Sequence, residues 1–149
     1  MTTDNSQPQV INTAQYVKDC SFEAPGAPFA ITKIKNPPKI DLSVDIKVQA
    51  YEDDNYEVAL VINVKATDEE LVLFVLELEF GSIFNITGIN DETQKEQILL
   101  IYCPSLIFPF ARRIVSDLTR DGGFQPLMLN PIDFAGLYAR QKEQQSKPN

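Results

Sequence analysis

The chain has 149 residues, of which 44% are hydrophobic and 23% are charged, an ordinary composition for one soluble globular domain. Its 13 basic residues are outnumbered by 21 acidic ones, which gives a net charge of −8. Such a surface repels nucleic acid and anionic lipid and favours basic partners, so we expect no nucleic-acid binding. The absence of histidine removes the commonest general base and the commonest metal ligand.

The cysteines and the apolar segments predict the compartment. Cys20 and Cys103 form no CxxC pair; a single disulfide is possible in principle, but we expect free buried thiols in a reducing cytosol, and no zinc site. The polar start, Met1 to Gln15, lacks the basic and apolar regions of a secretory signal. The longest apolar stretch, Ile98 to Ala111, is too short to span a bilayer. These features predict a cytoplasmic protein without cofactor, metal or direct membrane insertion.

The segment from Tyr16 to Pro25 is predicted to be the first strand, ended by a proline that has no N–H to donate. Strand alternation places two carboxylates on one face. That face carries Val17, Asp19, Ser21 and Glu23, and the other carries Tyr16, Lys18, Cys20 and Phe22. A connection from about Ala24 to Lys39 follows, and its length and apolar residues indicate a functional rather than a disordered segment.

Three further strands are predicted over Ile40–Tyr51, Tyr56–Thr67 and Leu71–Phe80, joined by short acidic turns as an antiparallel meander. The last is expected to bury Val72, Phe74, Leu76, Leu78 and Phe80. Its other face reads Leu71, Leu73, Val75, Glu77 and Glu79. A solvent face with this much aliphatic surface should be covered by another subunit or visited by a partner.

A long helix is predicted from a cap at Asn90 towards Leu118, ended by Gly122 and Gly123 and kinked or broken at its two prolines. Its apolar residues cover most of its circumference, more than one sheet can bury, so we expect a second copy of the chain against it. The expected interface residues are Leu99, Leu100, Ile101, Cys103 and Ile107.

A second helix is predicted to start at Asn130–Pro131–Ile132–Asp133, with Asn130 as its cap. We expect a flexible N-terminus over residues 1–11, one domain over 12–141 and a flexible tail over 142–149.

The chain carries no nucleotide-binding, zinc-protease or calcium-loop motif. Its acidic pairs, Asp53–Asp54 and Glu69–Glu70, fall in turns where solvated charge is the better interpretation. Cys103 has no possible imidazole partner, which indicates a buried structural thiol. An enzyme is therefore not expected. The alternative is a non-catalytic carrier or enzyme with an apolar pocket for a lipid-like ligand.

Several separated blocks carry a family resemblance. They are Tyr16–Pro25, Asp54–Val58, Gly81–Ile89, Tyr102–Arg112 and Leu127–Phe134. In this order they closely resemble the SecB family of bacterial protein-export chaperones, over about residues 12 to 141. The fourth block is the most specific, because it has two prolines inside a helix. The chain departs from the usual pattern at Ile34, where the family often has Trp, at Ser82, where it has Gly, and at Val75, where it has Leu.

The resemblance implies an α+β fold: a four-stranded antiparallel sheet, with the first strand crossing over to pair beside the fourth in a Greek key, and two C-terminal helices. It implies an ATP-independent holdase that binds unfolded preproteins and delivers them to the motor SecA. It also implies a homotetramer assembled as a dimer of dimers.

The resemblance also implies two binding sites. The zinc-bearing basic C-terminal tail of SecA would dock on Asp19, Glu23, Val75 and Glu77. Unfolded clients would lie in a groove walled by the crossover connection and the second helix. The expected lining is Phe29, Ile31, Ile34, Ile132, Phe134 and Leu137.

Overall fold

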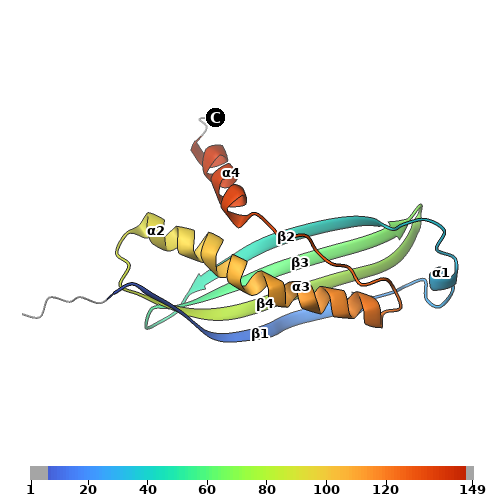
Figure 1. Ribbon diagram of the computed structural model, residues 1–149, viewed down its shortest axis with the longest axis horizontal. Coiled ribbons are helices and arrows are strands. Elements are labelled where there is room, and N and C mark those ends of the chain that lie inside the picture. The colour runs from blue at the N-terminus through green and yellow to red at the C-terminus, as the bar shows by residue number, and fades with distance from the viewer. Residues whose placement is uncertain (1–6, 147–149) are drawn as a thin grey trace, which may run out of the picture.

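Alternating apolar residues build one antiparallel sheet of four long strands (Figure 1). The computed structural model describes residues 7–146. The strands are β1 (Gln9–Glu23), β2 (Lys39–Ala50), β3 (Asn55–Asp68) and β4 (Leu71–Thr87). Their order is β1-β4-β3-β2, so the crossover connection, which contains the short helix α1 (Phe29–Thr32), carries the chain from one edge of the sheet to the other. The expected fold class and the pairing of the first strand beside the fourth are confirmed.

A bulge changes which residues of β1 share a face. Val17 lies opposite Phe80 and Asp19 lies opposite Glu79, so Lys18 is an extra residue between the two pairs. Simple alternation therefore fails here: Tyr16, opposite Gly81, lies on the face of Asp19, and Val17 lies on the other. The strand begins at Gln9, so residues 9–11 of the expected flexible N-terminus belong to β1, and residues 1–6 of that expectation lie outside the described residues.

A second bulge corrects the faces of β4. Ala66 pairs with Phe74 and Thr67 pairs with Val72, which leaves Leu73 as the extra residue. Leu73 is fully buried, whereas Val72 is only partly buried, the reverse of the expectation from alternation. The strand also continues past Phe80 to Thr87. At Gly81 the ring of Tyr16 lies directly over this strand. A Cβ at that position would be 2.5 Å from the ring, so only glycine leaves room for it.

The helical half of the chain is one continuous rod: α2 (Glu92–Gln97), the π-helical segment η1 (Ile98–Tyr102) and α3 (Cys103–Asp121). Asp91, not Asn90, caps it, accepting a hydrogen bond from the Thr93 N–H at 2.9 Å. The prolines do not break it. The wider turn lets Cys103 donate to the Ile98 carbonyl just before Pro104, where a regular helical bond is missing.

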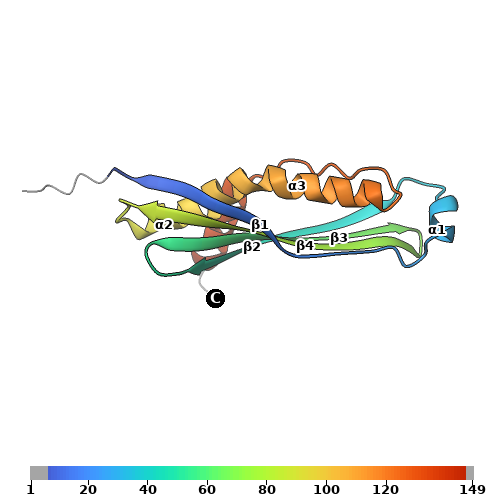
Figure 2. The same ribbon diagram turned by 90° about the horizontal axis from the view of Figure 1, so that it is seen from below.

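The rod lies on one face of the twisted sheet, and the core fills the space between them (Figure 2). We call this the inner face of the sheet and the opposite side the outer face. The core takes the inward residues of β3 and β4 together with one side of the rod. Among residues 7–146, no helix lies flat on the outer face (Figure 2).

The rod is longer than the apolar stretch that the sequence suggested. Over its 30 residues, Glu92–Asp121, it is long and apolar enough to cross a membrane, with a hydropathy of 1.6 over its best window. Core helices of soluble proteins satisfy the same test, and this helix packs on the sheet. Only 39% of the most apolar segment of the helix is buried, however, so the side facing away from the sheet is uncovered.

The chain then returns along α3 to α4 (Phe134–Ser146), which projects past the sheet (Figure 1). The Asp133 carboxylate accepts the Gly136 N–H at 3.0 Å, so the helix begins after Asp133 and not at Asn130. Residues 142–146 of the expected flexible tail continue this helix, while residues 147–149 lie outside the described residues.

Candidate binding surfaces

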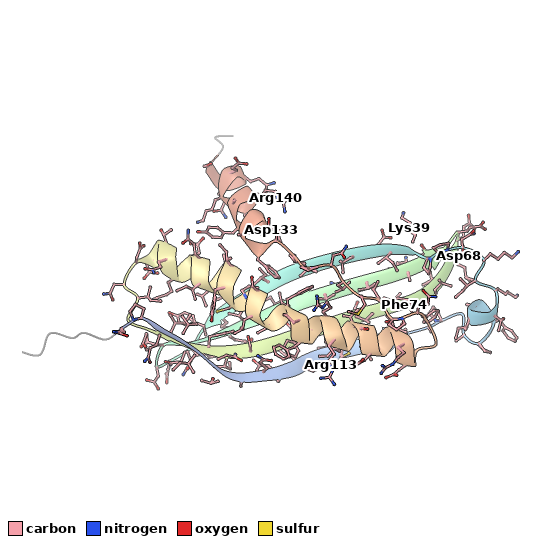
Figure 3. All side chains as sticks on the ribbon, viewed as in Figure 1. Lys39, Asp68, Phe74, Arg113, Asp133 and Arg140 are labelled. Atoms are coloured by element: carbon pink, nitrogen blue, oxygen red, sulfur yellow. The ribbon has the colours of Figure 1, made fainter. Side chains whose placement is uncertain are left out.

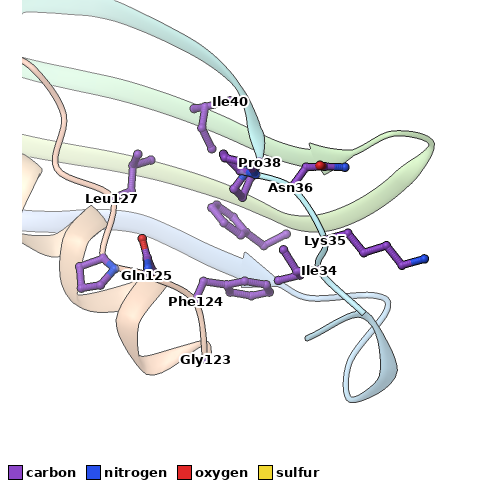
Figure 4. Close-up of a pocket in the computed structure, with 12 residues that line it drawn as sticks. Ile34, Lys35, Asn36, Pro38, Ile40, Gly123, Phe124, Gln125 and Leu127 are labelled. Atoms are coloured by element: carbon purple, nitrogen blue, oxygen red, sulfur yellow. The ribbon is translucent and has the colours of Figure 1, made fainter. Parts of the chain in front are cut away.

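A pocket of about 550 Å³ opens at the end of the molecule where the crossover connection meets the return segment after α3 (Figure 4). Its walls come from residues 34–40 on one side and residues 123–127 on the other, with Phe74 of β4 at its base. Its lining is mostly apolar. The lining residues are Ile34, Lys35, Asn36, Pro37, Pro38, Ile40, Phe74, Gly123, Phe124, Gln125, Pro126 and Leu127.

Two of the lining residues, Phe74 and Phe124, pack together with a third aromatic ring, Phe22, from a distant part of the chain. Phe74 lies near the C-terminal end of α3 (Figure 3), where its ring centroid is 5.0 Å from that of Phe124. Phe22 of β1 stacks on Phe74 at 5.4 Å and reaches Phe124 at 6.4 Å. Gly123, at φ +91°, makes the left-handed turn that brings Phe124 back over the sheet. The pocket is therefore apolar, open and held by ring packing.

The six residues predicted to line one client groove do not lie together. Ile34 lines the pocket just described, and Ile31 contacts its edge at Gly123. Phe29 points to solvent, with 70% of its surface exposed. Phe134 is 2% exposed and packs edge-on against Phe108 in the core.

The other predicted groove residues lie towards α4. Leu137 and Phe134 border a separate hollow of about 150 Å³ between α4 and β2. Ile132 is partly buried against the core. The sequence missed Phe124 and Leu127 as pocket residues and assigned Phe74 only to the core. The sequence did contain a signal for Phe124. Two glycines end the helix, and an aromatic residue directly after them is turned back towards the body of the protein.

The outer face of the sheet carries the four residues predicted to meet a basic tail. Glu23 of β1 pairs directly with Val75 of β4, and Ser21 pairs with Glu77. In the next row Asp19 lies opposite Glu79, which the sequence analysis did not select. Because directly paired residues point to the same face, the structure brings the predicted set together. We call Asp19, Glu23, Val75, Glu77 and Glu79 the acidic patch.

The acidic patch continues across the sheet onto β3 and β2. Val75 is paired with Lys65 and Glu77 with Asn63, and a shallow hollow of about 290 Å³ runs from Val75 and Glu77 to Asp41. Lys47 of β2 forms an ion pair with Glu79 at 3.1 Å, which offsets one of these negative charges. The patch combines three exposed carboxylates, those of Asp19, Glu23 and Glu77, with the partly buried Glu79 and one aliphatic side chain, a surface suited to a basic and partly apolar segment.

Next to the acidic patch, a polar cluster spans three strands. The Tyr16 hydroxyl of β1 donates to the Glu57 carboxylate of β3, and Lys18 bonds the same carboxylate at 2.8 Å. The Lys18 hydrogen bond, followed by the Tyr16 hydrogen bond, holds the pKa of Glu57 below its usual value. Burial, followed by the bond to Glu57, raises the pKa of Tyr16. The cluster therefore fixes the β1 bulge from which Asp19 projects.

The long helix presents an apolar stripe that differs from the predicted interface. Leu99, Cys103 and Ile107 face the sheet and belong to the core, while Leu100 and Ile101 are partly buried. The exposed residues are Tyr102, Leu106 and Phe110, with 50%, 40% and 49% of their surfaces accessible. They recur every four residues and so form one stripe facing away from the sheet. The sequence of a helix that is apolar all round does not indicate which of its sides faces the sheet.

The two thiols are separate and unpaired. Cys103 is buried in the core, and burial raises its pKa to about 12. Cys20 is exposed on β1, so the expectation that both thiols are buried is wrong for this one; desolvation, followed by the charge of Asp19, raises its pKa. Over residues 7–146, no cluster of three or more Asp, Glu, Cys or His side chains is arranged to hold a metal ion.

Comparison with known proteins agrees with these features. The family model described as "Preprotein translocase subunit SecB" matches residues 3–145. The chain is 50% identical over 134 residues to the protein-export protein SecB of Maricaulis maris, covering 90% of this chain and 77% of that protein. It is 44% identical over 140 residues to SecB of Rickettsia akari, covering 93% and 91% of the two chains.

A more distant relative and a solved structure extend the comparison. SecB of Bartonella bacilliformis is 42% identical over 150 residues, covering 99% of this chain and 94% of that protein. The SecB-like chaperone Rv1957 of Mycobacterium tuberculosis, solved with a peptide from the antitoxin HigA1, shares the fold at a TM-score of 0.70 and 17% identity, covering 83% of this chain and 90% of that one. The chain belongs to the SecB family, the non-enzymatic chaperones of preprotein export.

Proposed function

We propose that this chain is an ATP-independent holdase of the cytoplasm. Apolar segments of unfolded preproteins enter the pocket lined by Phe74, Phe124 and Leu127. The acidic patch on the outer face docks the zinc-bearing basic C-terminal tail of the motor SecA, to which the client is delivered. Four copies assemble as a dimer of dimers.

The pocket is the observation that carries the client-binding part of the proposal. Its aromatic base and proline-rich wall offer apolar contact without a geometric demand for one particular side chain, as a binder of many sequences requires. The SecB-like chaperone Rv1957 was solved in complex with a peptide, which supports peptide binding on this fold. Holding a client rests on burial of apolar surface and needs no bond chemistry.

The pairing of Glu23 with Val75, beside Glu77, supports the docking of a basic tail. The patch lies on the outer face, whereas Phe22 and Phe74, their neighbours in sequence, point to the pocket on the inner face. One copy of the chain therefore has room for a client on one side of the sheet and the motor tail on the other.

The uncovered stripe of Tyr102, Leu106 and Phe110 supports assembly. Large apolar side chains at this spacing are stabilised when another copy of the helix covers them. Leu100 and Ile101 lie beside the stripe and are partly buried. A second copy of the chain packed on the stripe would cover the side of the helix that the sheet does not cover.

One assay tests the proposal directly. Purified protein, without ATP, is mixed with an unfolded preprotein as denaturant is diluted, and aggregation is followed by light scattering. We expect aggregation to stop near one assembly per preprotein. Unchanged aggregation, together with a tightly bound small molecule in native mass spectra, would replace the holdase with a carrier of a lipid-like ligand.

A further inference from the structure

One buried residue holds both ends of a pocket wall. Thr119, near the end of α3, is fully buried. Its main-chain carbonyl accepts the Phe124 N–H at 3.0 Å, and its hydroxyl oxygen accepts the Leu127 N–H at 2.9 Å. Between these two bonds run the four residues Phe124–Leu127, all of which line the pocket (Figure 4).

The hydroxyl is fully used in this arrangement. While accepting from Leu127 it donates towards the main-chain carbonyls of Val115 and Ser116, each at 3.0 Å. The Leu127 N–H is partly buried, and removing the hydroxyl would take away its only protein acceptor in this arrangement. The two residues between Phe124 and Leu127 add little to hold the wall in place, because Pro126 has no N–H to donate and Gln125 lines the open pocket.

We propose that Thr119 is a positioning residue for client binding: its side-chain hydroxyl holds the Phe124–Leu127 wall over Phe74 and so sets the width of the pocket. Thr119 touches no client itself and acts through Leu127. The inference rests on the proposed function of this pocket, and it adds the residue that keeps the pocket in its open, preformed shape. A preformed wall lowers the ordering cost of each binding event.

The test compares three full-length proteins: unmodified, Thr119→Val and Thr119→Ser. Valine keeps the shape of threonine but removes the hydroxyl, and serine keeps the hydroxyl. Hydrogen exchange of the Leu127 amide reports the wall, and fluorescence titration with reduced, carboxymethylated α-lactalbumin, a permanently unfolded chain, reports client affinity. Circular dichroism and light scattering confirm the fold and the assembly of each variant.

We expect Thr119→Val to speed exchange of the Leu127 amide by about fivefold to a hundredfold, the range for an unsatisfied buried N–H, and to weaken probe binding by about fivefold or more. Thr119→Ser, which loses the methyl but keeps the hydroxyl, should stay within about twofold of the unmodified protein in both measurements. Unchanged exchange in Thr119→Val would overturn the inference.

A fourth variant, Leu127→Asp, separates this inference from the proposed function. It places a charge in the pocket wall and should weaken probe binding if clients enter there. If Leu127→Asp weakens binding but Thr119→Val speeds exchange without changing affinity, Thr119 does not position the pocket for clients. If Leu127→Asp leaves affinity unchanged, the pocket is not the client site, and the proposed function and this inference are both wrong.

Discussion

The Tyr16 hydroxyl reaches across strand β4 to the Glu57 carboxylate, joining two strands that are not neighbours in the sheet. Gly81 lies beneath the ring, and any side chain at that position would collide with it. The same carboxylate holds Lys18, the extra residue of the β1 bulge. This contact therefore fixes the register of the edge strand, and with it the direction in which Asp19 and Glu23 project.

The pH dependence of stability should report this cluster. Because the folded-state pKa of Glu57 lies below the ordinary value of 4.5, its contribution is fully present above pH 4.5 and is lost as pH falls through the lowered folded value. Glu57→Gln should reduce stability at pH 7 and flatten the decline below pH 4.5. Urea unfolding at fixed protein concentration, from pH 7 down to pH 3, measures both.

Tyr16→Phe serves as the matched control for this prediction. It removes one hydrogen bond but leaves the Lys18–Glu57 pair, so it should cost about 1 kcal/mol at pH 7 and keep most of the acid sensitivity. Equal acid profiles for the unmodified protein and Glu57→Gln would show that this carboxylate does not contribute.

The strand order could be predicted from the alternating segments and the family resemblance. Which residues of β1 and β4 point to the inner or the outer face of the sheet could not. Each bulge adds one residue to a strand, and the pattern of apolar residues in the sequence does not reveal it. Val17 and Leu73 were therefore assigned to the wrong faces, while Asp19 and Glu23, both beyond the bulge, kept their relation to each other. The faces of these residues depend on how strands distant in the sequence pair, and local alternation in one sequence does not reveal that register.

The β2–β3 turn should gain stability from glycine. Asp53 and Asp54 both have φ near 61°, a left-handed conformation that costs energy for residues with a side chain. Asp54→Gly should raise the free energy of unfolding by about 0.5–1 kcal/mol. Asp45→Gly, within β2, should lower it, because glycine weakens a strand interior. Thermal unfolding of the two variants should shift in opposite directions, and destabilisation by Asp54→Gly would contradict the strain argument.

Adjacent residues on the long helix separate assembly from folding. Leu106 is 40% exposed in one protomer and Ile107 is fully buried. Leu106→Asp should keep the circular dichroism of the folded protein but shift light scattering from the tetramer to a smaller species. Ile107→Asp should unfold or aggregate the chain, since an unpaired buried charge costs several kcal/mol. An unmodified protein that is monomeric at micromolar concentration would remove the assembly proposal.

The two thiols should differ in reactivity. Alkylation of native protein at pH 8 should label Cys20 alone, because Cys103 is buried and its pKa of about 12 leaves almost no thiolate. Denaturant should expose the second thiol. Mass spectrometry counts the labels, and a Cys20–Cys103 bridge in freshly isolated protein would contradict the assignment of both as free.

The candidate sites were predictable to different degrees for a physical reason. Glu23, Val75 and Glu77 needed only the correct pairing of two strands, which the resemblance supplied. The pocket depends on where the return segment folds back, and that is set by a left-handed Gly123 and by bonds to Thr119. Phe134 was assigned to a surface because apolar character alone does not separate a groove from a core.

Motor binding and client binding should separate by their response to salt. Glu77 lies on the outer face, where charges are screened over about 8 Å at physiological ionic strength. Glu77→Lys should weaken binding of a basic SecA tail peptide by about tenfold at low salt and reduce its salt dependence. Client holding should persist, because the pocket is on the inner face and apolar burial is not weakened by screening.

Glu52→Lys is the control, because it makes the same change in net charge in the β2–β3 turn, far along the sheet from Glu77. It should leave motor affinity nearly unchanged, since local pairing with the tail and not total charge sets the effect. Both affinities are measured across one salt series for the three proteins. Loss of client holding with motor binding intact in Glu77→Lys would exchange the roles of the two faces. Equal weakening of motor binding by Glu52→Lys and Glu77→Lys would show that the net charge of −8, and not the acidic patch, attracts the tail.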